Sequence, residues 1–189
     1  MMQYTTVFSI LFFTTCIVSL VSGILVLQNN RKAPANLCFF WLVIAVNFWS
    51  LGLALATSAT NVVTCEFWRR FSAIGWGSAY AIILHFVIII SGTERPRKKW
   101  WFYLLLYLPA AISVFSFAIP SEINKNPYQL IRTEFGWVNV AGNSIWDWIF
   151  YVYYIGYTIT SLLLLLRWNK KSSDITVKRQ SRIIFLSFV

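Results

Sequence analysis

The side chains in this sequence that could do chemistry are the few charged residues that border or enter its long apolar stretches. Glu66, Arg69 and Arg70 form one such group. Charged groups near a membrane interior are costly, so they indicate either a paired structure or a functional site. Glu66 and Arg70 are four residues apart with the acid first, which favours an ion pair on a helix. The alternative is that Arg69 or Arg70 faces a cavity and meets Asp147 or an anionic ligand.

Asp147 is the second candidate, and it lies between Trp146 and Trp148. Ser144 precedes it by three residues, the spacing of a capping box, and an acid in the first helical turn is favoured by the helix dipole. The alternative is that Asp147 faces a ligand, since concave aromatic sites with a few polar groups are typical of ligand pockets. Three tyrosines lie on or near the adjoining helix face, namely Tyr151, Tyr154 and Tyr157.

Other polar residues inside the apolar stretches predict structure rather than catalysis. His85 is the only histidine, and no carboxylate or cysteine stands three or four residues from it, where a helical metal site would place one. We expect His85 and Asn47 to form hydrogen bonds between helices. The three cysteines show neither metal-ligand spacing nor a disulfide framework. No catalytic or nucleotide-binding motif occurs, so we expect no enzyme activity, no metal and no cofactor.

The elements that must position these residues are membrane-spanning helices. The sequence is 58% apolar and 12% charged, whereas a soluble domain has roughly 45–50% apolar and about 25% charged residues. A helix of about 20 residues crosses the hydrocarbon layer. Charge-poor runs of this length predict an all-α membrane protein, a polytopic helical bundle with five full transmembrane helices. The expected spans are residues 5–27, 37–59, 70–92, 101–119 and 145–166.

The two ends of the chain extend this prediction. The first apolar run has no basic leader region and no small-residue cleavage site, so we expect a retained helix rather than a signal peptide. Residues 183–189 look like the start of a sixth span, but seven apolar residues cannot cross a bilayer. Residues 1–189 are therefore expected to form a single, incomplete membrane region.

The distribution of basic residues predicts how the helices are oriented. The connectors that follow helices 1, 3 and 5 contain two, four and six Lys or Arg residues, together 12 of the 16 in the chain. Connectors rich in Lys and Arg stay in the cytoplasm. We therefore expect the N-terminus and the 120–144 loop outside and the 167–182 linker inside. The net charge of +10 then reflects contact with the lipid bilayer, and no nucleic-acid partner is expected.

The outer loop contains a strand pattern of its own. Residues 128–134 and 137–140 are rich in β-branched and aromatic residues, and Phe135 and Gly136 separate them. This arrangement predicts a small β-hairpin. It would be the only sizeable part of the chain outside the membrane.

Four short motifs, spread in order over nearly the whole chain, can be compared with a known family. They are Asn30–Asn36 followed by Phe39 and Trp49, Phe67–Phe71 followed by Gly75 and His85–Phe86, Phe135–Trp137 followed by Gly142, and Lys178–Arg182 before the last apolar run. Together they resemble the N-terminal seven-transmembrane region of bacterial sensor histidine kinases. The resemblance implies a sensory module in the bacterial plasma membrane, homodimeric when it signals. In that family the seventh helix leads to a cytoplasmic output domain, usually a histidine kinase and sometimes a diguanylate cyclase; this chain stops early in helix 6.

The leading functional hypothesis is therefore detection of an extracytoplasmic or membrane signal, such as a small molecule or a peptide. We expect the signal to bind between the outer ends of helices 2, 3 and 5, under the outer loop, and to bias their packing. The candidate binding residues are Trp49, Arg69, Arg70, Trp137, Asp147 and Trp148. The alternative is a small transporter or channel-like protein, for which Asn47 and His85 make a sparse polar path. A third hypothesis is a membrane enzyme or its subunit, and the lack of a converging nucleophile, base or set of metal ligands in the sequence counts against it.

Overall fold

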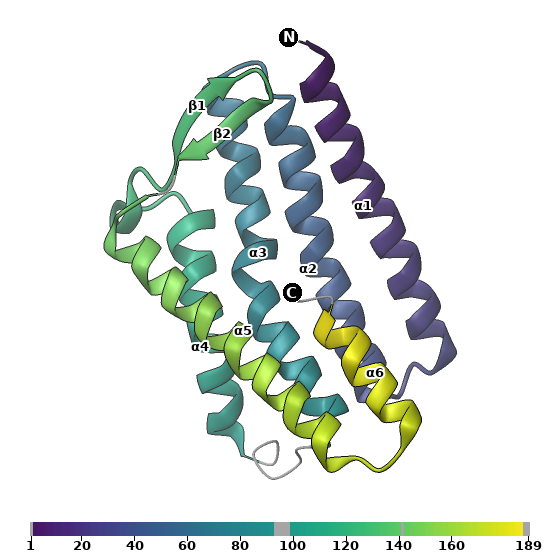
Figure 1. The fold of residues 1–189 in the computed structure, drawn as a ribbon. Coiled ribbons are helices and arrows are strands. Elements are labelled where there is room, and N and C mark those ends of the chain that lie inside the picture. The colour runs from purple at the N-terminus through teal and green to yellow at the C-terminus, as the bar shows by residue number, and fades with distance from the viewer. Residues whose placement is uncertain (1, 93–98, 141, 187–189) are drawn as a thin grey trace.

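The computed structural model describes residues 2–92, 99–140 and 142–186, with side chains from Tyr4 onward. In this part of the chain, one β-hairpin lies between the fourth and fifth α-helices in sequence, and the other elements are helices (Figure 1). The elements are α1 (Met2–Asn29), α2 (Pro34–Thr57), α3 (Val62–Ile90), α4 (Trp100–Ala118), the 3-10 helix η2 (Glu122–Asn124), β1 (Gln129–Thr133), β2 (Gly136–Val140), α5 (Ile145–Lys171) and α6 (Ile175–Leu186).

Helices α1 to α5 are each long and apolar enough to cross a membrane. Large apolar side chains cover their outer surfaces; Ile17, Val152 and Leu163 are 62%, 72% and 60% exposed. A soluble protein does not leave apolar patches of this extent in water, whereas lipid chains solvate them. The chain is therefore an all-α polytopic membrane protein, and the fold class predicted from the sequence is confirmed.

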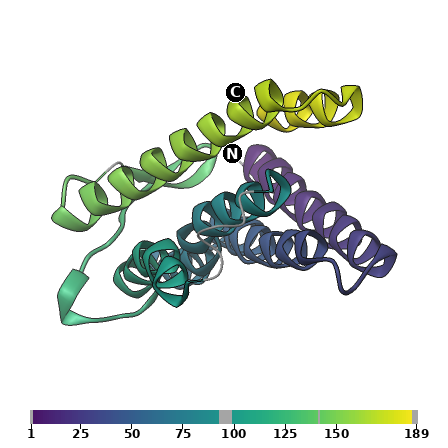
Figure 2. The ribbon, with the colours of Figure 1, turned by 90° about the horizontal axis from the view of Figure 1, so that it is seen from below.

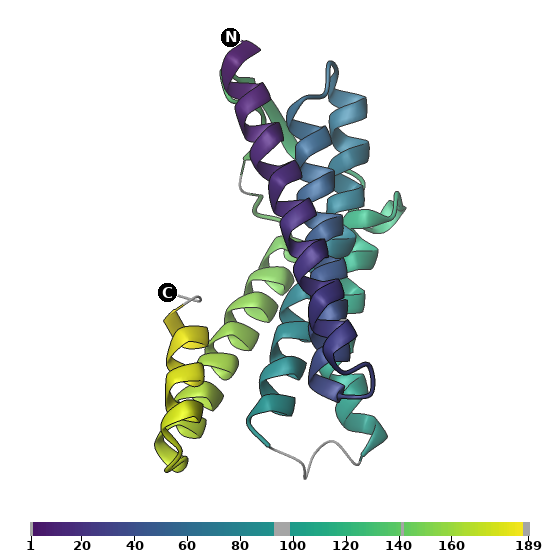
Figure 3. The ribbon, with the colours of Figure 1, turned by 90° about the vertical axis from the view of Figure 1, so that its right-hand side faces the viewer.

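The helices are arranged in two layers. Helices α1, α2, α3 and α4 lie side by side in chain order, and α5 crosses one face of this layer with α6 folded back beside it (Figures 2 and 3). Helix α3 contacts α2, α4 and α5, so it is the centre of the bundle. The N-terminus and the hairpin lie at one end, here called the hairpin end (Figure 1). The α1–α2 connector and the α5–α6 turn lie at the other, here called the basic end.

Small residues let α2 and α3 pack backbone against backbone. A Cβ on Gly75 would overlap the backbone of Ala45 and Trp49, and a Cβ on Gly52 would lie 2.6 Å from the Ser72 Cβ. Small residues are the usual means by which membrane helices approach closely. Five alanines of the two helices are almost fully buried, namely Ala54, Ala56, Ala73, Ala79 and Ala81. This contact fixes the register of the central helix pair.

Helix α1 is joined to α2 by hydrogen bonds. The Asn47 side chain donates to Ser19 Oγ at 2.9 Å and accepts from Cys16 Sγ at 2.8 Å. Ser9 Oγ also donates to the Ala54 carbonyl at 2.9 Å. The expected role of Asn47 as a bond between helices is therefore confirmed. Bonds of this kind contribute about 0.6–2 kcal/mol each inside a membrane.

The helix boundaries differ from the apolar runs that predicted them. Helix α3 begins at Val62 rather than near residue 70, because the Asn61 side chain caps it by accepting from the Thr64 N–H at 2.8 Å. Helix α5 continues to Lys171 instead of ending near residue 166. The expected 167–182 linker is largely helical, with a break at residues 172–174 before α6. Hydropathy marks which residues contact lipid, whereas the end of a helix is set by its capping and backbone hydrogen bonds.

The predicted β-hairpin is confirmed. Strands β1 and β2 pair antiparallel, with Gln129 opposite Val140 and Thr133 opposite Gly136. Gly136 has φ +102°, and a Cβ there would lie 2.7 Å from the Thr57 carbonyl oxygen. Glycine is required at this position both by the backbone conformation and by the close approach to α2.

Two parts of the sequence-based interpretation lie outside the described residues. One is the polar connector after helix 3, residues 93–98, which contributes three of the basic residues used to predict orientation. The other is the chain end, residues 187–189. The outcome for α6 therefore concerns Ile175–Leu186 alone, and this helix starts eight residues before the predicted sixth span.

Candidate ligand-binding site

The hairpin is fastened to the ends of α2 and α3 by Trp137 and Arg69. The Trp137 indole donates to the Ala59 carbonyl at 2.9 Å, and Arg69 Nη2 donates to the Trp137 carbonyl at 2.8 Å. The Trp137 ring packs on a buried cluster that includes Ala56 and Cys65. Burial of one large aromatic and two directional bonds therefore hold the hairpin over the helix ends.

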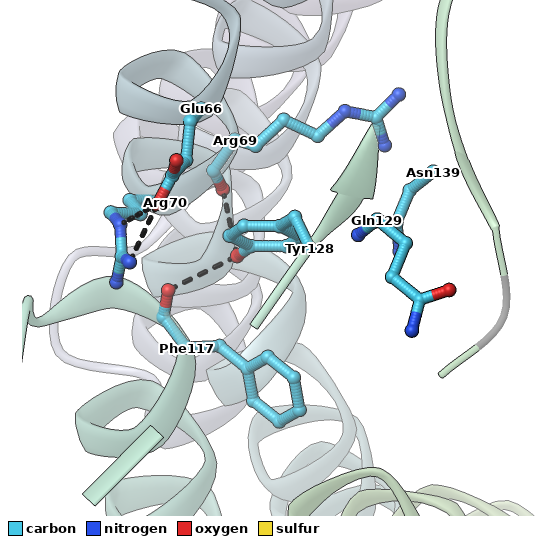
Figure 4. Close-up of polar contacts among 7 residues, drawn as sticks. All are labelled: Glu66, Arg69, Arg70, Phe117, Tyr128, Gln129 and Asn139. Carbon is cyan, nitrogen blue, oxygen red and sulfur yellow. Dashed lines mark hydrogen bonds and ion pairs between the residues drawn. The ribbon is translucent and has the colours of Figure 1, made fainter. Parts of the chain in front are cut away.

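Tyr128 fastens the start of the hairpin to two further helices. Its hydroxyl lies 3.3 Å from the Arg69 carbonyl of α3 and 3.1 Å from the Phe117 carbonyl of α4 (Figure 4). Phe117 is in the last turn of α4, where carbonyls lack helical partners. Burial raises the pKa of Tyr128 above its ordinary value, so the phenol stays protonated and donates. The backbone of Gln129 is fixed as well, by a 2.8 Å bond to Asn139 Oδ1.

A cavity of about 300 Å³ lies beneath this fastened hairpin. It is enclosed by the hairpin-end halves of α2, α3 and α5, by Phe117 of α4 and by the loop segments on either side of the strands. Its lining residues are Trp49, Leu53, Arg69, Ser72, Trp76, Tyr80, Phe117, Pro127, Tyr128, Asn139, Gly142, Asp147, Phe150 and Tyr151. We call it the hairpin cavity.

The hairpin cavity holds opposite charges that do not pair. Arg69 and Asp147 both line it, yet neither of the two ion pairs among the described residues joins them. Arg69 Nε is buried and has no hydrogen-bond partner. A buried charged donor without a partner costs free energy that a bound acceptor would recover. The arrangement is suited to a small polar molecule with an anionic group.

Asp147 also caps α5, as the sequence predicted. The Asp147 N–H donates to Ser144 Oγ at 3.2 Å, and the Ser144 N–H donates to Asp147 Oδ2 at 2.9 Å. These reciprocal bonds form a capping box. A Cβ on Gly142 would meet the Asp147 carboxylate, so this glycine lets the loop lie against the acid. Asp147 is therefore both a cap and part of the cavity wall.

The six candidate residues are separated into two groups by the structure. Trp49, Arg69 and Asp147 line the hairpin cavity together. Arg70, Trp137 and Trp148 do not, and direct contact of these three with a bound molecule stays a prediction.

Each residue of the second group has another position. Arg70 Nη2 lies 2.6 Å from Glu66, which confirms the predicted helical ion pair (Figure 4). Trp137 anchors the hairpin. Trp148 borders a separate apolar groove of about 870 Å³ between α3, α4 and α5, and its indole donates to Asn143.

Several cavity residues were not predicted, although Tyr151 was expected on or near the face that adjoins Asp147. On α3, Ser72, Trp76 and Tyr80 follow Arg69 at intervals of three, four and four residues. On α5, Phe150 and Tyr151 follow Asp147 by three and four. These intervals place each set on one helix face. Extending the two charged candidates along their own faces would have found the aromatic wall.

Below the hairpin cavity, α5 is held to α3 by Tyr153. Its hydroxyl accepts from the Ala81 N–H at 2.9 Å and donates to the Gly77 carbonyl at 3.1 Å. Gly77 and Ala81 are four residues apart, so these two groups pair with each other in an ordinary α-helix. A side chain of α5 thus forms hydrogen bonds with a backbone donor and a backbone acceptor of α3.

Tyr157 holds α5 to α4 in a related way. Pro109 lies inside α4 and lacks the N–H that would bond to the Leu105 carbonyl. The Tyr157 hydroxyl donates to that carbonyl at 2.8 Å and lies 3.2 Å from the Leu106 carbonyl. Neighbouring helices commonly satisfy backbone groups freed by proline in membranes.

The described residues contain no group of three or more His, Cys, Asp or Glu side chains that could hold a metal ion. Sequence comparison agrees with the fold. The profile of the family described as the N-terminal 7TM region of histidine kinase matches residues 11–189. Comparison with curated proteins and with solved structures gave no match. The chain therefore belongs to the family of N-terminal seven-transmembrane sensor regions of histidine kinases.

Proposed function

We propose that this chain detects a small extracytoplasmic signal in the hairpin cavity and passes the event to a cytoplasmic output domain. Membership of a sensor-region family supports a sensory role. The observation that carries the proposal is that Arg69 and Asp147 line one cavity without forming an ion pair, while the buried Nε of Arg69 has no hydrogen-bond partner. Charges are expensive to hold in this way unless they meet a ligand.

In the proposed orientation the hairpin end faces outward across the bacterial plasma membrane. Arg31, Lys32 and Lys99 lie in connectors at the opposite end, and the last turn of α5 contributes Lys170 and Lys171. Lys and Arg accumulate on the cytoplasmic side of membrane proteins. The hairpin cavity is then reached from outside, and α6 emerges on the inside.

The cavity chemistry defines the class of signal. A volume of about 300 Å³ is at the low end of ligand pockets, which suits a small molecule or the end of a peptide. The anionic group of the signal meets Arg69, and a cationic or donor group meets Asp147. The rings of Trp49, Trp76 and Tyr80 pack against the remaining part of the bound signal molecule. A free amino acid has these features.

Helix α5 connects the cavity to the basic end. Asp147 stands in its first turn, and its last turn leads directly to α6. A signal that binds Arg69 of α3 and Asp147 of α5 together favours one relative position of these helices. It can shift the equilibrium only by its difference in affinity between the two positions. The output domain, a histidine kinase or a diguanylate cyclase in a homodimer, reads that position.

The test is binding of the twenty amino acids and a panel of dipeptides to the full chain in lipid nanodiscs, measured by calorimetry. We expect a saturable ligand whose affinity falls at least tenfold in Arg69→Ala and in Asp147→Asn. Ser144→Ala is the matched control, because it removes the capping hydroxyl and keeps the carboxylate. Lys125→Ala controls for loss of a surface charge, since Lys125 pairs only with exposed Glu122.

Fusion of the chain to an output domain completes the test. The same Arg69 and Asp147 variants should abolish the response to the bound compound while membrane insertion stays unchanged. An unchanged response in both variants would overturn the hairpin cavity as the signal site. Ligand-dependent substrate flux into vesicles would instead identify a transporter.

A further inference from the structure

A second cavity lies at the basic end, away from the hairpin cavity. It has a volume of about 480 Å³ and is enclosed by α2, α3 and α4. Its position follows from its residues: Cys38 and Tyr103 are in the first two turns of α2 and α4, and His85 is in the last two turns of α3. The lining residues are Pro34, Leu37, Cys38, Trp41, Ile82, His85, Ile89, Tyr103 and Tyr107. We call it the basal cavity.

An aromatic box surrounds His85 on one side of the basal cavity. His85 Nδ1 lies 2.7 Å from the Tyr107 hydroxyl, which links α3 to α4 as expected for an interhelical histidine. The Tyr103 and Tyr107 rings stand edge-on to the imidazole, with centroids at 5.6 and 5.8 Å. The cavity wall is therefore built from rigid flat groups that suit a flat ligand ring.

The lining of the basal cavity contains no Lys, Arg, Asp or Glu among the described residues. A phosphate or carboxylate headgroup would find no fixed opposite charge there, and a free cation would find no carboxylate. Burying an ion without such a partner is strongly unfavourable. The described wall therefore offers no partner to an ion, which favours a neutral occupant.

Access to the basal cavity is from the bilayer. Trp41, Leu37 and Tyr103 are 60%, 41% and 37% exposed, and all three belong to membrane-spanning helices. Surface exposed on these helices is in contact with lipid. The occupant is therefore lipid-soluble as well as neutral.

Hydrogen-bond donors on the wall narrow the class further. Within the part of the chain that the structure describes, no hydrogen bond engages the Tyr103 hydroxyl or the Trp41 indole N–H. Donors in a lipid-facing cavity are stabilised by a ligand that carries acceptors. A plain acyl chain has none. A flat ring with carbonyl oxygens satisfies the donors and also packs between the aromatic side chains.

We propose that the basal cavity binds a membrane quinone. The quinone ring lies among Trp41, Tyr103, Tyr107 and His85, and its carbonyl oxygens accept from the donors on the wall. Its isoprenoid tail leaves towards the lipid past Leu37 and Trp41. The site is independent of the hairpin cavity, so it gives the sensor a second input from the redox carriers of the membrane.

The experiment is a titration of the full chain in phosphatidylcholine nanodiscs with decylubiquinone, followed by tryptophan fluorescence quenching. We expect saturable quenching, with an apparent affinity at least tenfold weaker in the Tyr103→Phe/Tyr107→Phe double variant. Both substitutions keep the ring and remove only the hydroxyl. Tyr151→Phe is the matched control at the hairpin cavity and should bind as the native chain does, as should Arg69→Ala.

A photoreactive azidoquinone then maps the site by mass spectrometry. Labels confined to Leu37–Trp41, Ile82–Ile89 and Tyr103–Tyr107 support the basal cavity. Equal affinity in the native chain and the double variant, labels spread over α1 and α5, or displacement of the quinone by dodecanol at the same concentration would each overturn the proposal. The last result would identify an acyl-chain site instead.

Discussion

Helix α3 makes two contacts that are built on different principles. Against α2 it presents Gly75, and Gly52 of α2 lies against Ser72 of α3, so the two backbones touch. Its contact with α5 uses hydrogen bonds between backbone groups of α3 and the Tyr153 hydroxyl, and α4 bonds to the Tyr157 hydroxyl of α5 in the same way. A contact between small residues has no second close-packed arrangement nearby. Hydroxyl-to-backbone bonds can break and leave both helices intact. From this difference we expect α2 and α3 to form a fixed frame and α5 to be the movable part.

Gly75→Ala is expected to have the largest effect on stability, because it acts on the close contact between α2 and α3. The added Cβ overlaps the α2 backbone, which cannot yield as a flexible side chain does. We expect a loss of about 1–3 kcal/mol in unfolding free energy, the usual cost of overpacking. Unfolding by sodium dodecyl sulfate in mixed micelles, followed by circular dichroism, measures it.

Gly156→Ala in α5 is the control for that substitution. A Cβ there meets nothing within 4 Å, so the variant should be neutral or about 0.5–1 kcal/mol more stable through reduced chain entropy. Equal losses at both glycines would show that the α2–α3 contact is no tighter than the surface of α5.

Tyr157→Phe should have the intermediate effect. It leaves the Leu105 carbonyl without a donor, because Pro109 has no N–H to replace the hydroxyl. We expect a loss of about 1 kcal/mol. In a Pro109→Ala background the restored N–H satisfies this carbonyl, so the cost of Tyr157→Phe should fall towards zero in a double-mutant cycle. Additive losses would contradict the assigned role of Tyr157.

Tyr153→Phe should cost least, below about 1 kcal/mol, because the Ala81 N–H and the Gly77 carbonyl are four residues apart in a continuous α-helix and can bond to each other without the hydroxyl. The main effect of this variant should be on the distance between α3 and α5 instead of on stability. Spin labels at Ile74 and Ile159, both exposed, should report a broader α3–α5 distance distribution than in the native chain. A loss as large as that of Gly75→Ala, or an unchanged distribution, would contradict the idea of a movable α5.

Much of the fold was predictable because membrane insertion depends on composition. Apolar runs located all five spans, and the strand pattern around Gly136 located the hairpin. Local spacing also predicted the Glu66–Arg70 pair and the Ser144–Asp147 cap. The helix ends were not predictable from hydropathy, since α5 and α6 continue through charged residues that leave the lipid without leaving the helix.

The site was predicted only in part, for a physical reason. Arg69 and Asp147 could be predicted to border one cavity because charges at a membrane surface are conspicuous, and their binding role stays a prediction. The roles of Tyr153 and Tyr157 depend on which backbone groups face them across another helix. No periodicity in one helix encodes the rotation and distance of its neighbour. Trp137 and Arg70 both have partners within the fold, which the residue type alone did not reveal for Trp137, and contact of either with a ligand stays a prediction.

The fastening of the hairpin has a mechanical consequence. Within ten residues, the phenol of Tyr128 is tied to α3 and α4, and the indole of Trp137 is tied to the turn after α2. Tyr128 directly precedes β1 and Trp137 belongs to β2, so the pairing of the two strands joins the two anchors. A molecule that displaced one anchor would therefore displace the other, and the contacts of the hairpin with α3, α4 and the turn after α2 would be lost together. In the proposed sensory role, the hairpin would then detach in a single step, and the dose–response would follow one release event rather than a gradual loosening.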